Sequence, residues 1–323
     1  MSETRILLIH TGGTIGMVRS GDGFAPKTGV VEDEVARLLR SDLVGLQVEI
    51  FRLDPLIDSA NATPQDWNRI TQAIEARHDD FDGFVVTHGT DTLAYTAAAL
   101  TQSLENLGKP VILTGSMLPL SEPDNDGQRN LSDALLAIAT AAPGVRVQFA
   151  GRLLHGARIR KTHSHSFDAF DAVPTGMAPL RSGHNGLTRH VYGTPDIAVL
   201  PVVPGGAGNV LKYAAQQCDG IVLRCFGSGT IPNTANTEEA LRIAYARGIP
   251  VLAVSQCPEG GIALGTYAAG AILTRYHAVD GRDMTMEAGY VKMVLALSQS
   301  SDISTLRRFL SVPLCGEIEP ETA

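Results

Sequence analysis

The sequence predicts an α/β protein, with a doubly wound parallel sheet in an N-terminal domain and a smaller α/β C-terminal domain. Apolar runs such as residues 6–9, 83–87 and 110–115 show no alternation, as expected for strands buried on both faces. Amphipathic helical patterns separate these runs. The alternation loosens near residue 151 and restarts at residue 197, and 323 residues are enough for two domains.

The N-terminal elements alternate regularly along the chain. The second expected helix has clear start signals, because Thr63 is a suitable N-cap and Pro64 suits the first helical position. The expected strands are residues 6–9, 48–53, 83–87 and 110–115, and the expected helices are residues 30–40, 63–77, 91–106 and 128–142.

The second half of the chain begins irregularly and then repeats the α/β pattern. Residues 151–167 have the pattern of a short hairpin or irregular strand pair, and residues 177–196 are rich in glycine, proline and polar residues. We therefore predict an N-terminal domain at 1–182, a linker at 183–196 and a C-terminal domain at 197–323. Its expected strands are residues 197–203, 220–226 and 250–255, and its expected helices are residues 210–218, 237–248, 287–300 and 304–310.

Composition excludes several classes of protein. Thirty-four acidic residues outnumber 26 basic ones, without basic runs, so we expect no nucleic-acid partner. No stretch approaches the roughly 20 apolar residues of a membrane span, and the acidic start MSETRILLIH does not resemble a signal peptide. The four cysteines are widely spaced, without a CxxC motif, and favour a reduced cytoplasmic compartment.

Two strand ends carry similar polar motifs. The first strand ends in TGGT at 11–14, and the third ends in THGTDT at 87–92. In an open parallel sheet, ligands bind at the carboxyl ends of the strands, near the point where the winding reverses. We therefore expect Thr14, Thr90 and Asp91 to converge on one pocket.

The motifs admit three interpretations. TGGTIG lacks the spacing of a dinucleotide loop and the lysine of a P-loop, which argues against a nucleotide site. Threonine and glycine at strand ends are often only turn residues, although two such motifs at neighbouring strands favour a site. Threonine can also act as a nucleophile when a neighbouring group removes its proton, and Lys161 is one candidate for that group.

These residues resemble the bacterial-type L-asparaginase family, and in particular its cytoplasmic type I branch. The resemblance covers nearly the whole chain, and the pair of motifs TGGT and HGTDT is highly specific. The matching segments are residues 11–17, 55–67, 82–100, 104–120, 126–131, 167–172 and 255–261.

The resemblance implies hydrolysis of asparagine to aspartate and ammonia, without a cofactor or metal. It implies that Thr14 is the first catalytic threonine and that Thr90, Asp91 and Lys161 form a proton relay. It also implies a homo-oligomer, either a dimer or a dimer of dimers. The residues assigned to substrate binding are Asp58, Ser59, Thr90, Asp91 and Ser116. A zwitterionic substrate needs an anion and several donors placed opposite its two charged ends.

The segment after TGGT departs from the family pattern. Residues 17–29 resemble a lid that closes over substrate. The family has a tyrosine ten residues after the nucleophile, whereas this chain has Phe24. Phe24 keeps the aromatic ring of that tyrosine but lacks its hydroxyl group.

One further group of residues could suggest a metal site, and its members are His163, His165, Asp168 and Asp171. The segment lacks a second zinc-type cluster, so we expect no metal there.

Some type I relatives bind a second, regulatory asparagine at the positions of Arg224, Ser255 and Cys257. A merely buried Cys257 is the favoured alternative.

Taken together, the sequence predicts a cytoplasmic type I-like L-asparaginase. One alternative is a related amidase acting on glutamine or another amide, since small changes near Ser59 would reshape the pocket. Another is an asparagine-binding regulatory protein with little turnover, which the loss of the phenol at Phe24 would favour. A fourth interpretation, an amidotransferase subunit, is weaker because such subunits usually carry an extra N-terminal domain.

Overall fold

The computed structural model describes residues 3–320 except 22, 42, 44 and 207. The chain folds into two compact units, and each is described here by itself. Unit 1 comprises Met1–Ala172 and Ala178–His190, and unit 2 comprises Val173–Met177 and Val191–Ala323.

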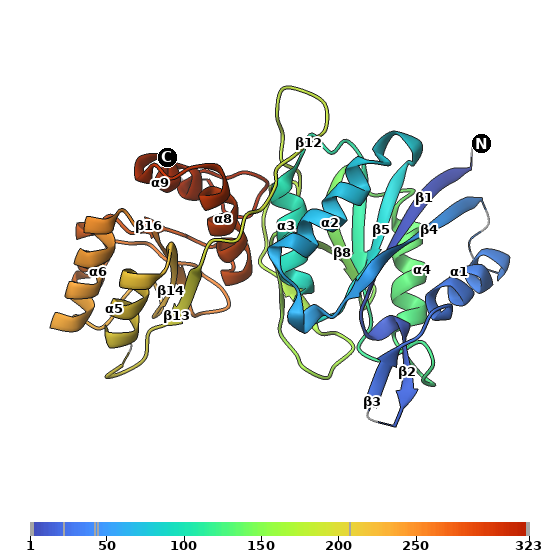
Figure 1. Cartoon of the computed structure of the whole chain (residues 1–323), viewed down its shortest axis with the longest axis horizontal. Helices are drawn as coiled ribbons and strands as arrows, with labels where there is room; N and C mark the ends of the chain where they lie inside the picture. Colours follow the sequence, from blue (N-terminus) through green and yellow to red (C-terminus); the bar gives the residue numbers. More distant parts are fainter. Residues whose placement is uncertain (1–2, 22, 42, 44, 207, 321–323) are drawn as a thin grey trace. The chain divides into compact units, whose positions relative to one another are not determined.

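Unit 1 is built on a six-stranded sheet in the order β4-β1-β5-β7-β8-β9 (Figure 1). Its first five strands are parallel, and β9 runs antiparallel to β8 at the edge. The bounds are β1 Thr4–Gly12, β4 Leu46–Ile57, β5 Gly83–Thr87, β7 Pro110–Thr114, β8 Gly144–Phe149 and β9 Arg152–His155. The predicted doubly wound parallel sheet is therefore confirmed, with one antiparallel edge strand added.

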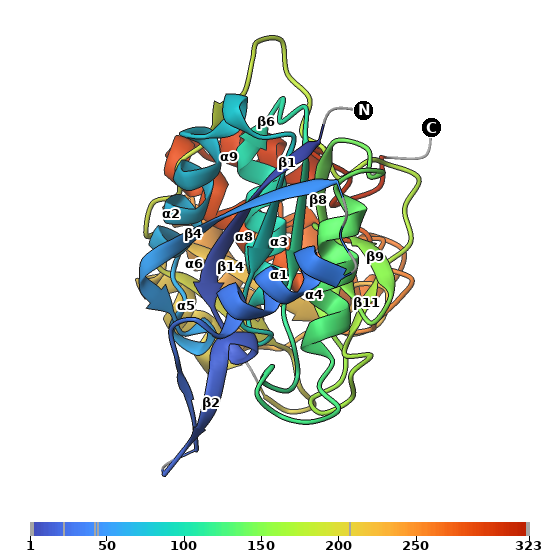
Figure 2. The same cartoon turned by 90° about the vertical axis from the view of Figure 1, so that its right-hand side faces the viewer.

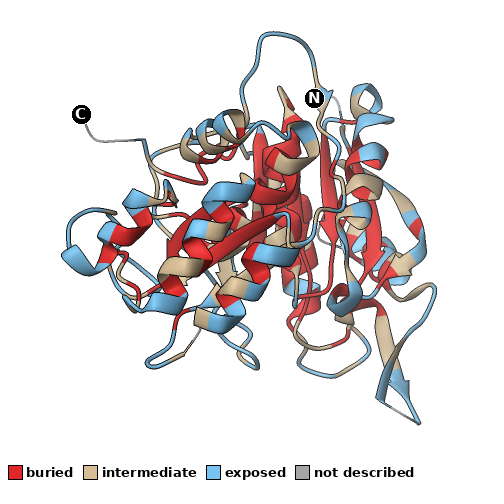
Figure 3. Cartoon of the chain, turned by 60° about the vertical axis from the view of Figure 1, so that its left-hand side comes forward, coloured by how far each residue is buried: buried red, intermediate tan, exposed pale blue. Residues whose placement is uncertain are grey.

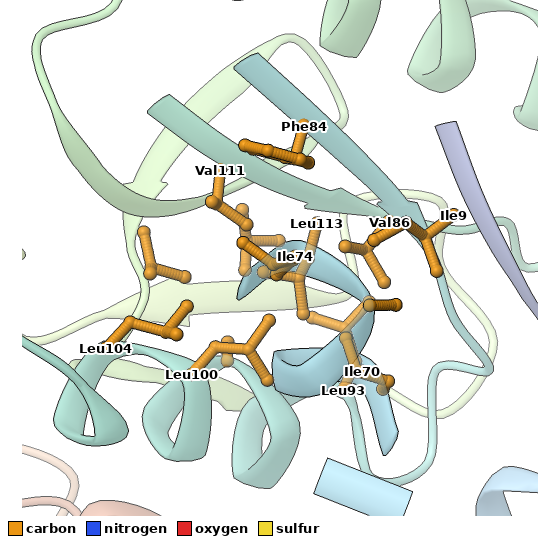
Figure 4. Packing of buried hydrophobic residues seen from close by; sticks show 14 of the residues in the cluster. Ile9, Ile70, Ile74, Phe84, Val86, Leu93, Leu100, Leu104, Val111 and Leu113 are labelled. Carbon is orange, nitrogen blue, oxygen red and sulfur yellow. The ribbon is translucent and has the colours of Figure 1, made fainter. Parts of the chain in front are cut away.

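Helices cover both faces of this sheet, because successive strand residues point to opposite sides. Leu7 and Ile9 pack with α2 (Pro64–Glu75) and α3 (Leu93–Ser103), while Ile6 and Leu8 pack with α1 and α4. Helices α1 (Val30–Ser41) and α4 (Gly127–Ala137) cover the same face of the sheet (Figure 2). Figure 4 shows the interleaved side chains of the first cluster, among them Ile9, Ile70, Ile74, Val86, Leu93, Leu100 and Leu113.

The start of α2 agrees with its sequence signals. Thr63 is the N-cap and Pro64 the first helical residue, and the Asp66 carboxylate accepts from both the amide and the hydroxyl of Thr63, each at 2.9 Å. By contrast, α3 ends at Ser103 and not near residue 106. The next residues form β6 (Leu104–Glu105), which pairs with β12 (Thr188–Arg189) and so replaces the last helical turn.

The segment after TGGT is more ordered than the expected loop. After the short helix η1 (Thr14–Gly16), strands β2 (Met17–Ser20) and β3 (Gly23–Pro26) form an antiparallel hairpin. The hairpin projects from unit 1 in both views (Figures 1 and 2). Residues 151–167 contribute β9 and β10 (Ile159–Lys161), and β10 pairs with β11 (Phe170–Ala172).

Unit 2 contains a four-stranded parallel sheet in the order β13-β14-β15-β16. Helices α5 (Gly208–Gln217) and α6 (Ala235–Arg247) pack against one face of this sheet. Gly289 of α8 (Met286–Gln299) faces Leu252 and Val254 on the other side. The central strands of both sheets are largely buried, whereas the edge strands β4, β9 and β13 are mostly half-buried or exposed (Figure 3). The strands are β13 Ile197–Pro201, β14 Gly220–Cys225, β15 Val251–Ser255 and β16 Val279–Asp280, and the helices are α5 Gly208–Gln217, α6 Ala235–Arg247, α7 Ala271–Arg275, α8 Met286–Gln299 and α9 Ile303–Ser311.

A buried ion pair connects the segment around Glu317 to helix α8 in unit 2. Lys292 and Glu317 are both fully buried, with Nζ and Oε1 2.6 Å apart. Glu317 also accepts from the amides of Leu314 and Cys315, so its charge is well compensated. Removing one partner of such a pair typically destabilises a protein by about 3–5 kcal/mol. Within the described residues, no helix combines the length and apolarity needed to span a membrane.

Candidate active site

The two threonine motifs lie at the switch point of the unit 1 sheet. Counted in chain order, its parallel strands have the spatial order 2-1-3-4-5, so β1 and β5 are neighbours at the position where the winding reverses. TGGT ends β1, and HGTDT follows β5 directly. The expected juxtaposition of the two motifs is therefore observed.

Three loops approach each other here at glycine positions. A Cβ on Gly13, whose φ is +91°, would lie 2.5 Å from the Gly89 amide nitrogen. A Cβ on Gly89 would lie 2.3 Å from Ser59 Oγ, and one on Gly12 would lie 2.5 Å from the Ile57 carbonyl oxygen. Real Cβ atoms do not come this close, so only glycine lets the loops after β1, β4 and β5 meet.

Lys161 joins the HGTDT loop from a distant part of the chain. Its Nζ donates to Thr90 Oγ1 at 2.9 Å and lies 2.9 Å from Asp91 Oδ1. Thr90 is buried, with 6% of its surface exposed, whereas the Asp91 side chain is 64% exposed. The structure thus brings Thr90, Asp91 and Lys161 into one hydrogen-bonded group that reaches solvent on the Asp91 side.

Buried hydrogen bonds next to this group join the end of β1 to the end of β5. The Thr11 hydroxyl donates to the Thr87 carbonyl oxygen at 2.7 Å, and His10 Nδ1 lies 2.8 Å from Thr87 Oγ1. His88 Nδ1 lies 2.8 Å from the Gly89 carbonyl oxygen, which can only accept, so Nδ1 carries the proton. Its Nε2 then accepts from the Thr96 hydroxyl at 3.0 Å. Burial lowers the pKa of both His10 and His88 below the ordinary value of 6.5.

The segment containing Asp58 and Ser59 packs beside HGTDT. Asp58 caps the short helix η2 (Ser59–Asn61), accepting from the Ala60 amide at 3.2 Å and from Asn61 Nδ2 at 2.7 Å. The Thr92 hydroxyl donates to the Ser59 carbonyl oxygen at 2.7 Å. Thr92 is therefore a positioning residue that the sequence reasoning missed, although it lies inside the THGTDT motif.

Ser116 lies in the loop that follows β7. It is 1% exposed, and its hydroxyl has no hydrogen-bond partner among the described residues. The same loop packs against HGTDT, because a Cβ on Gly115 would lie 2.3 Å from the His88 carbonyl oxygen. A buried hydroxyl without a partner is available to a ligand.

Asp126 and Asn130 hold this loop and were not singled out from the sequence. Asp126 accepts from the amides of Met117 and Leu118 at 2.9–3.0 Å. Asn130 Nδ2 donates to the Gly115 carbonyl oxygen at 3.0 Å and to Asp126 Oδ2 at 3.1 Å. The two side chains are four residues apart at the start of α4, so they lie on the same face of the helix. Both belong to residues 126–131, which resemble the family, and this spacing could have indicated their contact from the sequence.

Phe24 lies on the hairpin and contacts a cation. Its side chain is exposed, and the Arg19 guanidinium lies 5.1 Å from its ring centroid. Arg19 also pairs with Glu122 at 3.0 Å, which links the hairpin to the loop after β7. In this arrangement the ring packs on Arg19.

The residues of the expected regulatory site lie in unit 2. Arg224 is on β14, and Ser255 ends β15, where its register partner is Cys225. The Ser255 hydroxyl donates to the Gly227 carbonyl oxygen at 2.8 Å and accepts from the Cys257 amide at 3.0 Å. Cys257 is exposed, so the favoured expectation of a buried cysteine is wrong. The chain leaves the sheet after Ser255, and the thiol therefore lies beyond the core.

The polar side chains of residues 163–171, considered above for a metal site, have partners within the protein. Asp168 and Asp171 both pair with Arg152. His163 Nδ1 accepts from the amides of His165 and Ser166 at 3.0 and 2.8 Å. In the part of the chain that the structure describes, no cluster of three or more His, Cys, Asp or Glu side chains could hold a metal ion.

The fold and the site define a two-unit α/β protein with a threonine, a lysine and an aspartate joined at the switch point of its six-stranded sheet. Residues 5–187 match the family model "Asparaginase, N-terminal", and residues 196–310 match "Glutaminase/Asparaginase C-terminal domain". The chain belongs to the asparaginase family, within its type I branch, and it is an enzyme of the L-asparaginase class.

Individual relatives agree with the family match over their whole length. L-asparaginase 1 of Escherichia coli K12 is 38% identical over 99% of this chain and 100% of its own. The thermostable L-asparaginase from Thermococcus kodakarensis superposes with a TM-score of 0.89 at 31% identity, covering 98% of this chain and 100% of its own. L-asparaginase I from Vibrio cholerae superposes with a TM-score of 0.88 at 33% identity, covering 98% of this chain and 99% of its own.

Proposed function

We propose that the chain hydrolyses the side-chain amide of L-asparagine, with Thr14 as nucleophile and Thr90, Asp91 and Lys161 as a proton relay. The observation that carries the proposal is the position of Lys161 Nζ, 2.9 Å from both Thr90 Oγ1 and Asp91 Oδ1. A lysine so placed can exchange a proton with the Thr90 hydroxyl, while Asp91 compensates its positive charge.

The reaction proceeds in two acyl-transfer steps. Thr14 Oγ1 attacks the amide carbon and loses its proton to the relay, and the C–N bond breaks as the relay returns a proton to the leaving ammonia. Water then attacks the resulting ester, giving aspartate and free Thr14. Backbone amides of the glycine-rich loops after β1 and β5 supply donors for the negative charge that develops on the amide oxygen.

We assign substrate recognition to the side chains around these two loops. Asp91 is 64% exposed and provides the anion for the α-ammonium group. Asp58 and Ser59 lie on the loop packed against Gly89, where they can contact the α-amino and α-carboxylate groups. The partnerless hydroxyl of Ser116 serves as a further donor. We assign the hairpin carrying Phe24 to lid closure.

The assembly and the compartment belong to the same proposal. We propose a homo-oligomer, either a dimer or a dimer of dimers, working in the cytoplasm without a metal or other cofactor. Light scattering coupled to size-exclusion chromatography gives the oligomer mass directly, and a monomer at micromolar concentration would contradict this part.

Ammonia release from asparagine and from glutamine tests the proposal. We expect wild type to turn over asparagine, with a higher kcat/KM than for glutamine, and Thr14→Ala to lose nearly all turnover. A higher kcat/KM for glutamine would support the shifted-substrate alternative. Saturable asparagine binding without ammonia release would support the regulatory alternative and refute the proposed reaction.

A further inference from the structure

A cavity of about 450 Å³ lies in unit 2, against the edge strand β16 and helix α9. Its volume falls in the range typical of small-molecule sites. The residues that matter for its chemistry are His277, Asp280, Arg282, Arg307 and Arg308. Three guanidinium groups thus line one cavity in a chain whose net charge is −8.

Among the described residues that line the cavity, Asp280 is the one acidic residue, and both its carboxylate oxygens accept backbone hydrogen bonds. Asp280 Oδ2 accepts from the Leu264 amide at 2.8 Å, and its Oδ1 accepts from the Arg282 amide at 2.8 Å. Arg307 and Arg308 form no ion pair with any residue that the structure describes. Arg307 and Arg308 therefore contribute two positive charges to the cavity for which the described residues provide no ion-pair partner.

Two of the guanidinium groups are held in place. Arg282 Nη2 donates to the Ser311 carbonyl oxygen at 2.7 Å. Arg307 lies over the Tyr245 ring, 5.6 Å from its centroid, and Tyr245 stacks on His277 at 5.4 Å. Arg307 Nε is shielded from solvent and has no hydrogen-bond partner among the described residues. A buried donor left without a partner costs about 1–3 kcal/mol, so a ligand that accepts its bond is favoured.

We propose that this cavity binds a phosphorylated small molecule, with the phosphate group held by Arg282, Arg307 and Arg308. Guanidinium groups match phosphate geometry in a bidentate manner, and several of them suit a ligand with more than one negative charge. A free amino acid fits less well than a phosphate, because the described lining offers three guanidinium groups but one anion, Asp280, whose oxygens already accept backbone hydrogen bonds.

Titration calorimetry with inorganic pyrophosphate at constant ionic strength tests this site. We expect saturable binding of one pyrophosphate per chain, weakened at least tenfold in Arg307→Gln and in Arg308→Gln. Arg242→Gln is the matched control, because Arg242 is an exposed arginine of α6 that pairs with Glu239 and lies outside the cavity. It should bind pyrophosphate like wild type.

Three outcomes would overturn the proposal. One is the absence of saturable binding to wild type. Another is an equal loss in Arg242→Gln, which would indicate general charge attraction. The third is aspartate binding as tightly as pyrophosphate and being lost in Arg307→Gln, which would indicate an amino-acid site. A cooperative thermal unfolding transition and wild-type asparagine turnover in each variant show that the variants fold.

Discussion

Lys161 and Thr90 meet at 2.9 Å between Nζ and Oγ1, although 71 residues separate them in the sequence. Lys161 comes from β10 and Thr90 from the loop after β5, and Asp91 lies 2.9 Å from the same ammonium group. This relationship places a charged amino group against a buried hydroxyl at the switch point of the sheet.

Replacing Lys161 tests the relay. Lys161→Met should lower kcat for asparagine by about 10²- to 10⁴-fold, the usual effect of losing a general base, while the protein still folds. Thr90→Val combined with Lys161→Met should be little worse than either change alone, because residues acting as a unit are not additive. Lys212→Met, on α5 of unit 2, is the control. A near-normal kcat in Lys161→Met would refute the relay.

The close approach of the loops gives a second prediction. Gly89→Ala places a methyl group 2.3 Å from Ser59 Oγ and so pushes the two loops apart. We expect kcat/KM for asparagine to fall at least tenfold, or about 1.4 kcal/mol of transition-state stabilisation. Gly186→Ala, where a Cβ meets nothing within 4 Å, should match wild type. Unchanged kinetics in Gly89→Ala would show that this packing does not shape the site.

The hairpin gives a third prediction, which concerns the missing phenol. Phe24 stacks on Arg19, so the ring has a packing role that does not need a hydroxyl. Phe24→Tyr should change kcat by less than about tenfold. Phe24→Ala should be worse, because it removes the contact between the ring and Arg19. Ammonia release under saturating asparagine measures both, and a gain of orders of magnitude in Phe24→Tyr would instead favour a binding protein that has lost turnover.

A second asparagine site at Arg224, Ser255 and Cys257 predicts a sigmoidal velocity curve. Coupling between two sites is typically about 1–3 kcal/mol. Arg224→Ala should make the curve hyperbolic without removing turnover, because Arg224 lies on β14 of unit 2 and the relay lies in unit 1. Steady-state rates over the full substrate range decide this. Hyperbolic curves in both wild type and Arg224→Ala would exclude the second site.

The buried histidine of HGTDT gives a pH prediction. Burial lowers the pKa of His88 below 6.5, so the unfolded state binds more protons than the folded state as the pH falls. The free energy of unfolding should therefore decrease below pH 6.5, by at most about 1.4 kcal/mol per pH unit from this group.

The variant His88→Gln isolates this contribution, because glutamine keeps a donor and an acceptor but does not titrate. Denaturant unfolding at pH 7.5 and pH 5 should show a smaller acid-dependent loss in His88→Gln than in wild type. His184→Gln, at an exposed position, should lose as much stability as wild type. Equal losses in all three proteins would show that His88 does not contribute to the pH dependence.

The type and order of most elements could be predicted from the sequence. The runs at 6–9 and 83–87 lack alternation and form β1 and β5, and the signals at Thr63 and Pro64 mark the start of α2. These features depend on residues a few positions apart, whose side chains share a face of a helix or strand. Local periodicity therefore predicts them without knowledge of the rest of the chain.

The exceptions are segments whose partners lie far away in the sequence. Helix α3 ends early because Leu104 and Glu105 pair with residues 188–189, far along the chain. The exposure of Cys257 depends on where the chain leaves β15. No short-range pattern reports such contacts, because they depend on which strands become neighbours.

By itself, the sequence determined the α/β class, the strand ends that carry TGGT and HGTDT, and the family resemblance that the comparisons support. Only the tertiary structure decided that Lys161 reaches Thr90, that Gly13, Gly89 and Ser59 pack together, and that three arginines share a cavity in unit 2. The physical reason is the distance along the sequence over which each kind of interaction acts. Periodicity and capping act over one or two turns of chain, whereas these contacts follow from the order of strands in a folded sheet.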